Sequence, residues 1–68
     1  MTTFGERLRY LKDRKDVTFR QMAKDTGINV TSLQKYALGT MEPRLSRMEW
    51  IADYFGVSLD YLAGRESP

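Results

Sequence analysis

The side chains best suited to recognising another molecule are gathered in residues 18–39. Gln34 can pair bidentately with adenine, and Lys35 can donate a hydrogen bond to guanine. The methyl groups of Val30 and Thr31 can pack against the methyl group of thymine. The chemistry that this segment offers is therefore hydrogen bonding and apolar contact with the edges of bases.

Catalysis is not expected from this composition. The chain contains no histidine and no cysteine, which removes the commonest general base, the commonest metal ligand, thiolate sites and disulfides. The carboxylates of Asp13, Asp16, Glu42 and Glu49 fall on expected surfaces or loops, without a pocket that a small helical domain could readily enclose. We expect a protein that is not an enzyme and that uses no metal, cofactor or small-molecule substrate.

The length of 68 residues allows one domain, near the lower limit for a fold held by packing alone. No apolar run approaches the roughly 18 residues of a membrane span, and the first ten residues lack the apolar stretch of a signal peptide. A cytoplasmic protein without a membrane partner is therefore expected.

Charge is distributed unevenly along the chain. Residues 1–44 carry nine Lys or Arg against five Asp or Glu, whereas residues 45–68 carry two against four. This asymmetry suits a domain with one basic face for a polyanion, although ordinary solvated helix surface would also explain it. Arg9, Arg14 and Lys24 are expected to belong to such ordinary surface.

Capping residues and glycines divide the chain into five expected helices, and no strand pattern competes with them. Two of the helix starts have the residue pattern of a capping box, Thr3 with Glu6 and Thr18 with Gln21. The fourth helix could begin near Pro43 or at Ser46 with Glu49 as its box partner. The other expected caps are Asn29 and Ser58, and the expected stops are Gly27, Gly39, Gly56 and Gly64.

The apolar residues recur at helical spacing and predict a single core. Ile28, between Gly27 and Asn29, should fill the junction of the second and third helices. The fold class expected is all-α, a compact five-helix domain over residues 1–64 with a disordered tail at 65–68. The main expected core residues are Leu8, Met22, Leu33, Tyr36, Leu45, Ile51 and Phe55.

The layout of residues 18–39 is that of a helix-turn-helix unit, whose second helix enters the major groove of DNA. Ala23 supplies a small side chain where the two helices approach, and Gly27 supplies the positive φ of the turn. Ile28 and Leu33 attach the pair to the core. The third helix then shows its remaining residues to the solvent, which makes them candidate readers of DNA sequence.

The N-termini of the two helices in this unit could also bind phosphate groups. Thr18 and Asn29 cap the two helices, whose first amides offer free N–H groups and a partial positive charge. Arg20 and Arg44 flank the same face and could form ion pairs with phosphate.

The chain resembles the lambda repressor-like family of helix-turn-helix regulators, also called the Cro/C1-type or XRE family. The stretches FGERLRYLKDRK, YALGTMEP and IADYFGVSLDYLAG carry the resemblance, which covers about residues 4–64. It implies a five-helix domain that binds operator DNA as a homodimer and regulates transcription, more often as a repressor.

Carried over by position, the resemblance adds Thr40 and Met41, in the loop that usually touches phosphate, to the candidate contacts. Phe19, at the exposed start of the second helix, could pack against a sugar or a thymine methyl group. Four positions depart from the family pattern. Phe19 replaces a common Gln, Glu42 lies in a loop that is usually basic, and Ala37 and Lys12 replace a Glu and Arg that usually pair. The predicted DNA-binding residues are Thr18, Phe19, Asn29, Val30, Thr31, Gln34, Lys35, Thr40 and Arg44.

A second surface is expected near the end of the chain. Trp50 and Tyr54 lie beside the inner stripe of the fourth helix, where they could widen the core or form a contact surface. The resemblance places the dimer interface near Trp50, Tyr54, Val57, Leu59 and Tyr61. The alternative function is a protein-interaction module, such as an antitoxin, anti-repressor or subunit, that contacts protein through Phe19, Met41, Trp50 and Tyr54.

Overall fold

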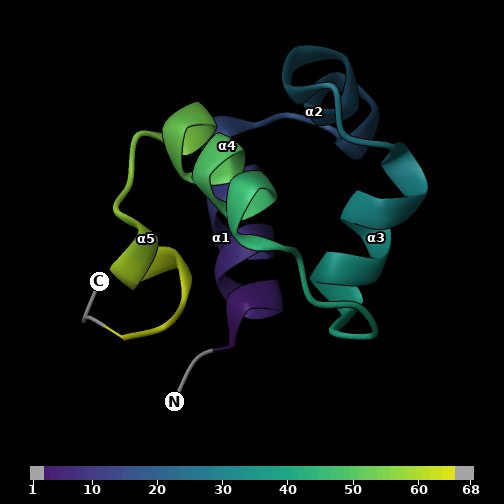
Figure 1. Cartoon of the computed structure of the whole chain (residues 1–68). Helices are drawn as coiled ribbons and strands as arrows, with labels where there is room; N and C mark the ends of the chain where they lie inside the picture. The colour runs from purple at the N-terminus through teal and green to yellow at the C-terminus, as the bar shows by residue number, and fades with distance from the viewer. Residues whose placement is uncertain (1–2, 66–68) are drawn as a thin grey trace.

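Five α-helices account for most of the chain in the computed structural model, which describes residues 3–65 (Figure 1). They are α1 (Phe4–Lys15), α2 (Phe19–Thr26), α3 (Val30–Leu38), α4 (Leu45–Phe55) and α5 (Leu59–Leu62). No strand occurs among residues 3–65, which confirms the all-α fold class. None of the helices in this range is long and apolar enough to cross a membrane.

The helix starts follow the predicted caps. The side-chain oxygens of Thr18 and Asn29 accept from the amides of Gln21 and Thr31 at 3.0 and 2.7 Å. The box expected at α2 is only half formed, because the side-chain amide of Gln21 donates to Asp25 at 2.8 Å instead of reaching back to the cap. The predicted stops at Gly27, Gly39 and Gly56 are confirmed, with φ of 79°, 82° and 68°. Asp16 also ends a helix in the left-handed region, at the end of α1 with φ 57°, and the sequence did not predict this stop.

The start of α4 corrects two expectations. The helix begins at Leu45 with Arg44 as its N-cap and without a capping side chain, so the start near Pro43 is confirmed and the alternative start at Ser46 is wrong. Leu45 was also expected in the core, yet 64% of its surface is exposed. Because Cα–Cβ bonds tilt toward the helix N-terminus, the side chain of a first residue projects past the end of its own helix. The burial therefore begins further along α4, at Ile51 and Ala52.

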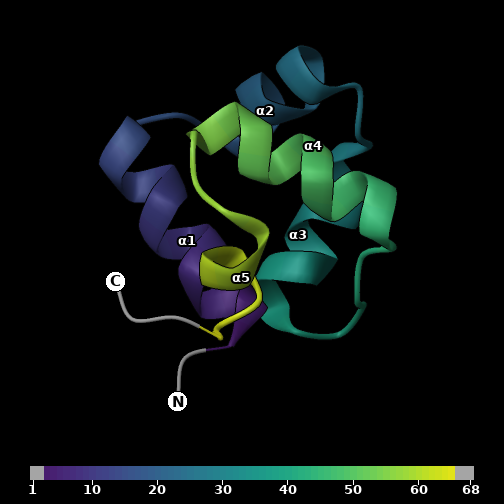
Figure 2. The ribbon, with the colours of Figure 1, turned by 60° about the vertical axis from the view of Figure 1, so that its left-hand side comes forward.

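All five helices contribute to one core, and Figure 2 shows them wrapped around a common centre. Ile28, in the turn between α2 and α3, is 1% exposed, which confirms that it fills this junction. α5 packs against both α1 and α4, and so closes the core beside the first turns of α1. The largest fully buried side chains are Leu8, Met22, Ile28, Leu33, Ile51 and Leu62.

The described chain ends just beyond α5. The amide of Arg65 donates to the carbonyl of Asp60 at 2.8 Å, and Gly64 has a φ of 81°. The rest of the tail predicted for 65–68 lies outside the described residues.

Two helices approach each other closely where Gly5 of α1 meets the C-terminal half of α3. A methyl group on Gly5 would lie 2.7 Å from the carbonyl oxygen of Ala37 and 2.8 Å from that of Tyr36. Both atoms belong to the backbone of a helix, so they cannot turn aside as a flexible side chain would. Gly5 is therefore the residue that lets α1 and α3 lie in contact.

We predict that Gly5→Ala lowers the free energy of unfolding by about 1–3 kcal/mol, because the added methyl forces the two helices apart. Ser46→Ala, at the corresponding second position of α4 and exposed, is the matched control and should change stability by less than about 0.5 kcal/mol. Urea unfolding followed by circular dichroism measures both. Alanine is the better helix former, so a gain in stability at Gly5 would show that the close approach does not constrain the fold.

Candidate nucleic-acid interface

The connection between α2 and α3 is fixed by hydrogen bonds as well as by its glycine. The hydroxyl of Thr26 donates to the carbonyl of Met22 at 2.7 Å and accepts from the amide of Ile28 at 3.2 Å. Gly27 takes the positive φ expected of it. These bonds, which have no signal in the sequence, hold the chain so that Ile28 enters the core and α3 begins two residues later.

α3 has one buried face and one exposed face. Leu33, Tyr36 and Ala37 are buried, and the hydroxyl of Tyr36 accepts from the guanidinium of Arg47 at 2.9 Å, which attaches α3 to α4. The predicted readers Thr31, Gln34 and Lys35 are exposed, whereas Val30 is half-buried. Leu38, at the end of the same face, is 71% exposed. This face is free for contact with a partner along the length of the helix.

The residues predicted to hold phosphate lie at the ends of helices. Thr18 and Asn29 are exposed and cap α2 and α3. Arg44 is exposed at the N-cap of α4, and Arg20 is exposed in the first turn of α2. The hydroxyl of Thr40 donates to the carbonyl of Lys35 at 3.3 Å, so it closes the end of α3 as well as facing the solvent.

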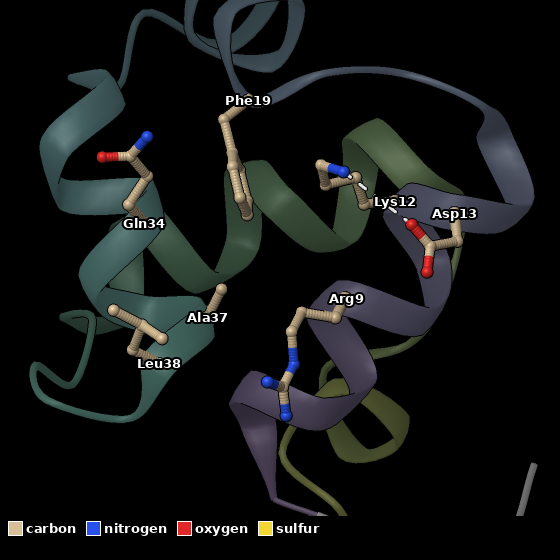
Figure 3. Close-up of a pocket in the computed structure, with 7 residues that line it drawn as sticks. All are labelled: Arg9, Lys12, Asp13, Phe19, Gln34, Ala37 and Leu38. Atoms are coloured by element: carbon tan, nitrogen blue, oxygen red, sulfur yellow. Dashed lines mark ion pairs between the residues drawn. The ribbon is translucent and has the colours of Figure 1, made fainter.

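Phe19 does not stand free at the start of α2, as the sequence suggested. Its ring is half-buried and packs against the core between α1 and α3 (Figure 3). The side-chain nitrogen of Lys12 lies 4.9 Å from the ring centroid and 3.7 Å from a carboxylate oxygen of Asp13. The small side chain of Ala37, on α3, points toward the ring of Phe19 (Figure 3). The expected exposure of Phe19 is therefore corrected to partial burial under a lysine.

A hollow of about 360 Å³ opens beside this ring, between α1 and α3 (Figure 3). One side of it is the exposed face of α3, through Gln34 and Leu38, and the other is α1, through Arg9 and Lys12. Its lining residues are Arg9, Lys12, Asp13, Phe19, Gln34, Ala37 and Leu38.

Tyr54 links α4 to the outer side of α2. Its hydroxyl donates to a carboxylate oxygen of Asp25 at 2.8 Å, and the side-chain nitrogen of Lys15 lies 5.0 Å from its ring centroid. Partial burial first, and then the hydrogen bond and negative charge of Asp25, raise the pKa of Tyr54 above its usual 10.0. The hydroxyl thus stays protonated and donating throughout the neutral range. Trp50, one turn earlier, is 51% exposed beside a shallow hollow that Asp25 also lines.

The second surface predicted from the sequence is largely engaged in packing. Tyr54, Val57 and Leu59 pack against the core, whereas Trp50 is the most exposed of the five. Tyr61 lies under the guanidinium of Arg7, 4.3 Å from its ring centroid, and Arg7 is only 7% exposed. Nothing in the sequence predicts that Arg7 is buried, because an arginine in the first turns of a helix is usually an exposed surface residue. No group of His, Cys, Asp or Glu suited to a metal ion occurs within residues 3–65.

Two short helices, a glycine turn and an exposed second helix define the class of structure as helix-turn-helix. A sequence model described as "Helix-turn-helix domain" matches residues 5–67. The chain therefore belongs to the helix-turn-helix domain family.

Relatives at 36–38% identity are named as regulators of transcription. One is an uncharacterized HTH-type transcriptional regulator, YonR, derived from the SPbeta prophage of Bacillus subtilis, 36% identical over 87% of this chain and 55% of its own length. Another is the cryptic phage CTXphi transcriptional repressor RstR of Vibrio cholerae, 38% identical over 88% of this chain and 54% of its own. A third is the uncharacterized HTH-type transcriptional regulator YqaE of B. subtilis, 36% identical over 94% of this chain and 55% of its own. The chain spans about half the length of these relatives, and no solved structure matches it significantly.

Proposed function

We propose that this chain is the sequence-specific DNA-binding domain of a transcriptional regulator, most simply a repressor, with α3 in the major groove. The observation that carries the proposal is the exposed face of α3, where Thr31, Gln34 and Lys35 project from a helix whose opposite face is buried. The printed names of the relatives support it. The domain spans residues 1–64 and is a cytoplasmic protein that acts by binding rather than by catalysis.

The proposed contacts divide into two kinds. Val30, Thr31, Gln34 and Lys35 contact bases, because amide, ammonium and methyl groups match the edges displayed in the major groove. The second kind contacts the DNA backbone and fixes the register of the protein on the duplex. Its members are Thr18, Phe19, Asn29, Thr40 and Arg44.

We further propose that two copies bind together. One helix-turn-helix buries too little surface for tight specific binding, and a dimer reads two half-sites about one helical turn apart. The proposed interface is the surface of Trp50, Tyr54, Val57, Leu59 and Tyr61. Because Trp50 is the most exposed of these side chains, it would contribute the most area.

The proposal is tested by measuring binding to a labelled random 20-base-pair duplex over a series of salt concentrations. We expect a Kd of about 10⁻⁴ to 10⁻⁶ M near physiological salt that weakens steadily as salt rises, because phosphate contacts release counterions. Absence of binding even at low salt would reject the DNA-binding function. It would leave the protein-interaction module, contacting a protein through Phe19, Met41, Trp50 and Tyr54.

The division of contacts is tested on a duplex selected from a random pool. Gln34→Ala and Lys35→Ala should each reduce the preference for the selected sequence over random duplex by about 1–3 kcal/mol, because they remove contacts with bases. Arg44→Ala should weaken binding to both duplexes alike, because it removes a contact with phosphate. Fluorescence anisotropy on both duplexes measures the two effects. Equal losses on both duplexes for all three variants would show that α3 does not read sequence.

A further inference from the structure

Among the residues that the structure describes, Arg9 is the basic residue of the hollow between α1 and α3 that has no partner. It is exposed, and within residues 3–65 it forms no hydrogen bond, ion pair or ring contact. Figure 3 shows its side chain leaving α1 on the side that faces α3, with the guanidinium turned away from Lys12 and Phe19. Lys12, by contrast, is engaged by both Asp13 and the ring of Phe19. The charge that a ligand in this hollow would meet uncompensated is therefore that of Arg9.

The lining of the hollow selects a particular kind of ligand. Arg9 and Lys12 provide donors and positive charge, while Phe19, Ala37 and Leu38 provide apolar surface. A ligand that matches both the positive charge and the apolar surface has an anionic group joined to a compact apolar group. The sugar–phosphate backbone of DNA has this composition, and the hollow adjoins Gln34, a proposed base contact. A strand whose bases meet α3 would thus carry its backbone past this hollow.

Charge also decides on which side of Arg9 the phosphate would lie. A second hollow adjoins Arg9 on the side of the α3–α4 loop, and two carboxylates, Glu6 and Glu42, line it. A phosphate there would meet negative charge, whereas on the side of Lys12 it would lie between two cations. Asp13 lowers the attraction of Lys12, but its own side chain is 79% exposed and points to the rim of the hollow.

We propose that Arg9 binds a backbone phosphate of one DNA strand in the hollow between α1 and α3, with the adjoining deoxyribose against Phe19 and Leu38. The proposal rests on the proposed DNA-binding function and adds to it a contact from α1. It also changes the role expected of Arg9, which the sequence alone placed with ordinary surface.

Arg14 provides a matched control in the same helix. Its guanidinium donates to the hydroxyl of Tyr10 at 3.1 Å and lies 5.7 Å from the centroid of that ring. Five residues along an α-helix turn a side chain by about 140° from Arg9, so Arg14 points away from the hollow. Removing either arginine subtracts the same charge, but only Arg9 faces the proposed phosphate.

The first test compares Arg9→Gln with Arg14→Gln on the random 20-base-pair duplex. We expect Arg9→Gln to weaken binding about three- to tenfold at low salt and to reduce the slope of log K against log salt by about 0.9, the value of one phosphate contact. Arg14→Gln should leave the slope unchanged. Equal effects of the two substitutions would overturn the proposal, because only the net charge would then matter. Circular dichroism spectra that match the unsubstituted protein show that both variants are folded.

The second test places the contact on the DNA. Single phosphates of the duplex selected from the random pool are replaced by uncharged methylphosphonates, one position at a time. The unsubstituted protein should lose affinity at several positions, and Arg9→Gln should become insensitive at one of them in each half-site. If Arg9→Gln keeps the full pattern of sensitive positions, Arg9 binds no phosphate and the inference is wrong, while the proposed function stands. If the unsubstituted protein binds no duplex at all, the proposed function itself fails.

Discussion

The packing of α1 against α3 fixes the direction in which α3 faces, and the rest of the proposed interface depends on it. Gly5 allows the two backbones to come so close that a single methyl group would clash with two carbonyl oxygens. With one side of α3 held in this way, Leu33 and Tyr36 enter the core and the opposite side is left to the solvent. The same contact brings α1 alongside α3 and so creates the hollow that Arg9 shares with Gln34.

Three of the four positions at which the chain departs from the lambda repressor-like pattern, Lys12, Phe19 and Ala37, lie together in this hollow. The resemblance pairs a Glu at position 37 with an Arg at position 12, and this chain has Ala37 and Lys12 instead. An alanine leaves space that a carboxylate would fill, and the ring of Phe19 lies against that space under Lys12. Where the resemblance implies an ion pair, this chain has the apolar side chains of Ala37 and Phe19 beside α3, with Arg9 at the edge of the hollow. A buried charge without its partner is costly, and the charge that remains here, on Lys12, has Asp13 and the ring of Phe19 beside it.

The sequence predicted the local features of the fold because these depend on neighbouring residues. Thr18 caps the helix that it precedes, Gly39 ends the helix that it follows, and the exposed side of α3 follows from the buried spacing of Leu33 and Tyr36. Leu45 was predicted wrongly because a periodic stripe does not show where the packed part of a helix ends. The roles of the predicted contact residues remain predictions, since they depend on DNA that the protein alone does not contain.

Contacts between residues far apart in the sequence account for what was missed. The hydrogen bond between Tyr54 and Asp25 joins residues 29 positions apart. It forms only because the fold places α2 and α4 side by side. Arg7 is buried against Tyr61 through the docking of α5, which no pattern in α1 indicates. Arg9 and Arg14 have the same chemistry in the sequence, and only the arrangement of α1 and α3 gives them different surroundings.

The central claim is that the exposed face of α3 is the surface that meets DNA. It is tested most directly by titrating isotope-labelled protein with the selected duplex and following the nitrogen–proton signals by nuclear magnetic resonance. The account predicts that the largest shifts fall on the backbone amides of Thr31 and Lys35 and on the side-chain amide of Gln34. A complex that forms while these three signals stay in place, with shifts confined to α4 and α5, would contradict it.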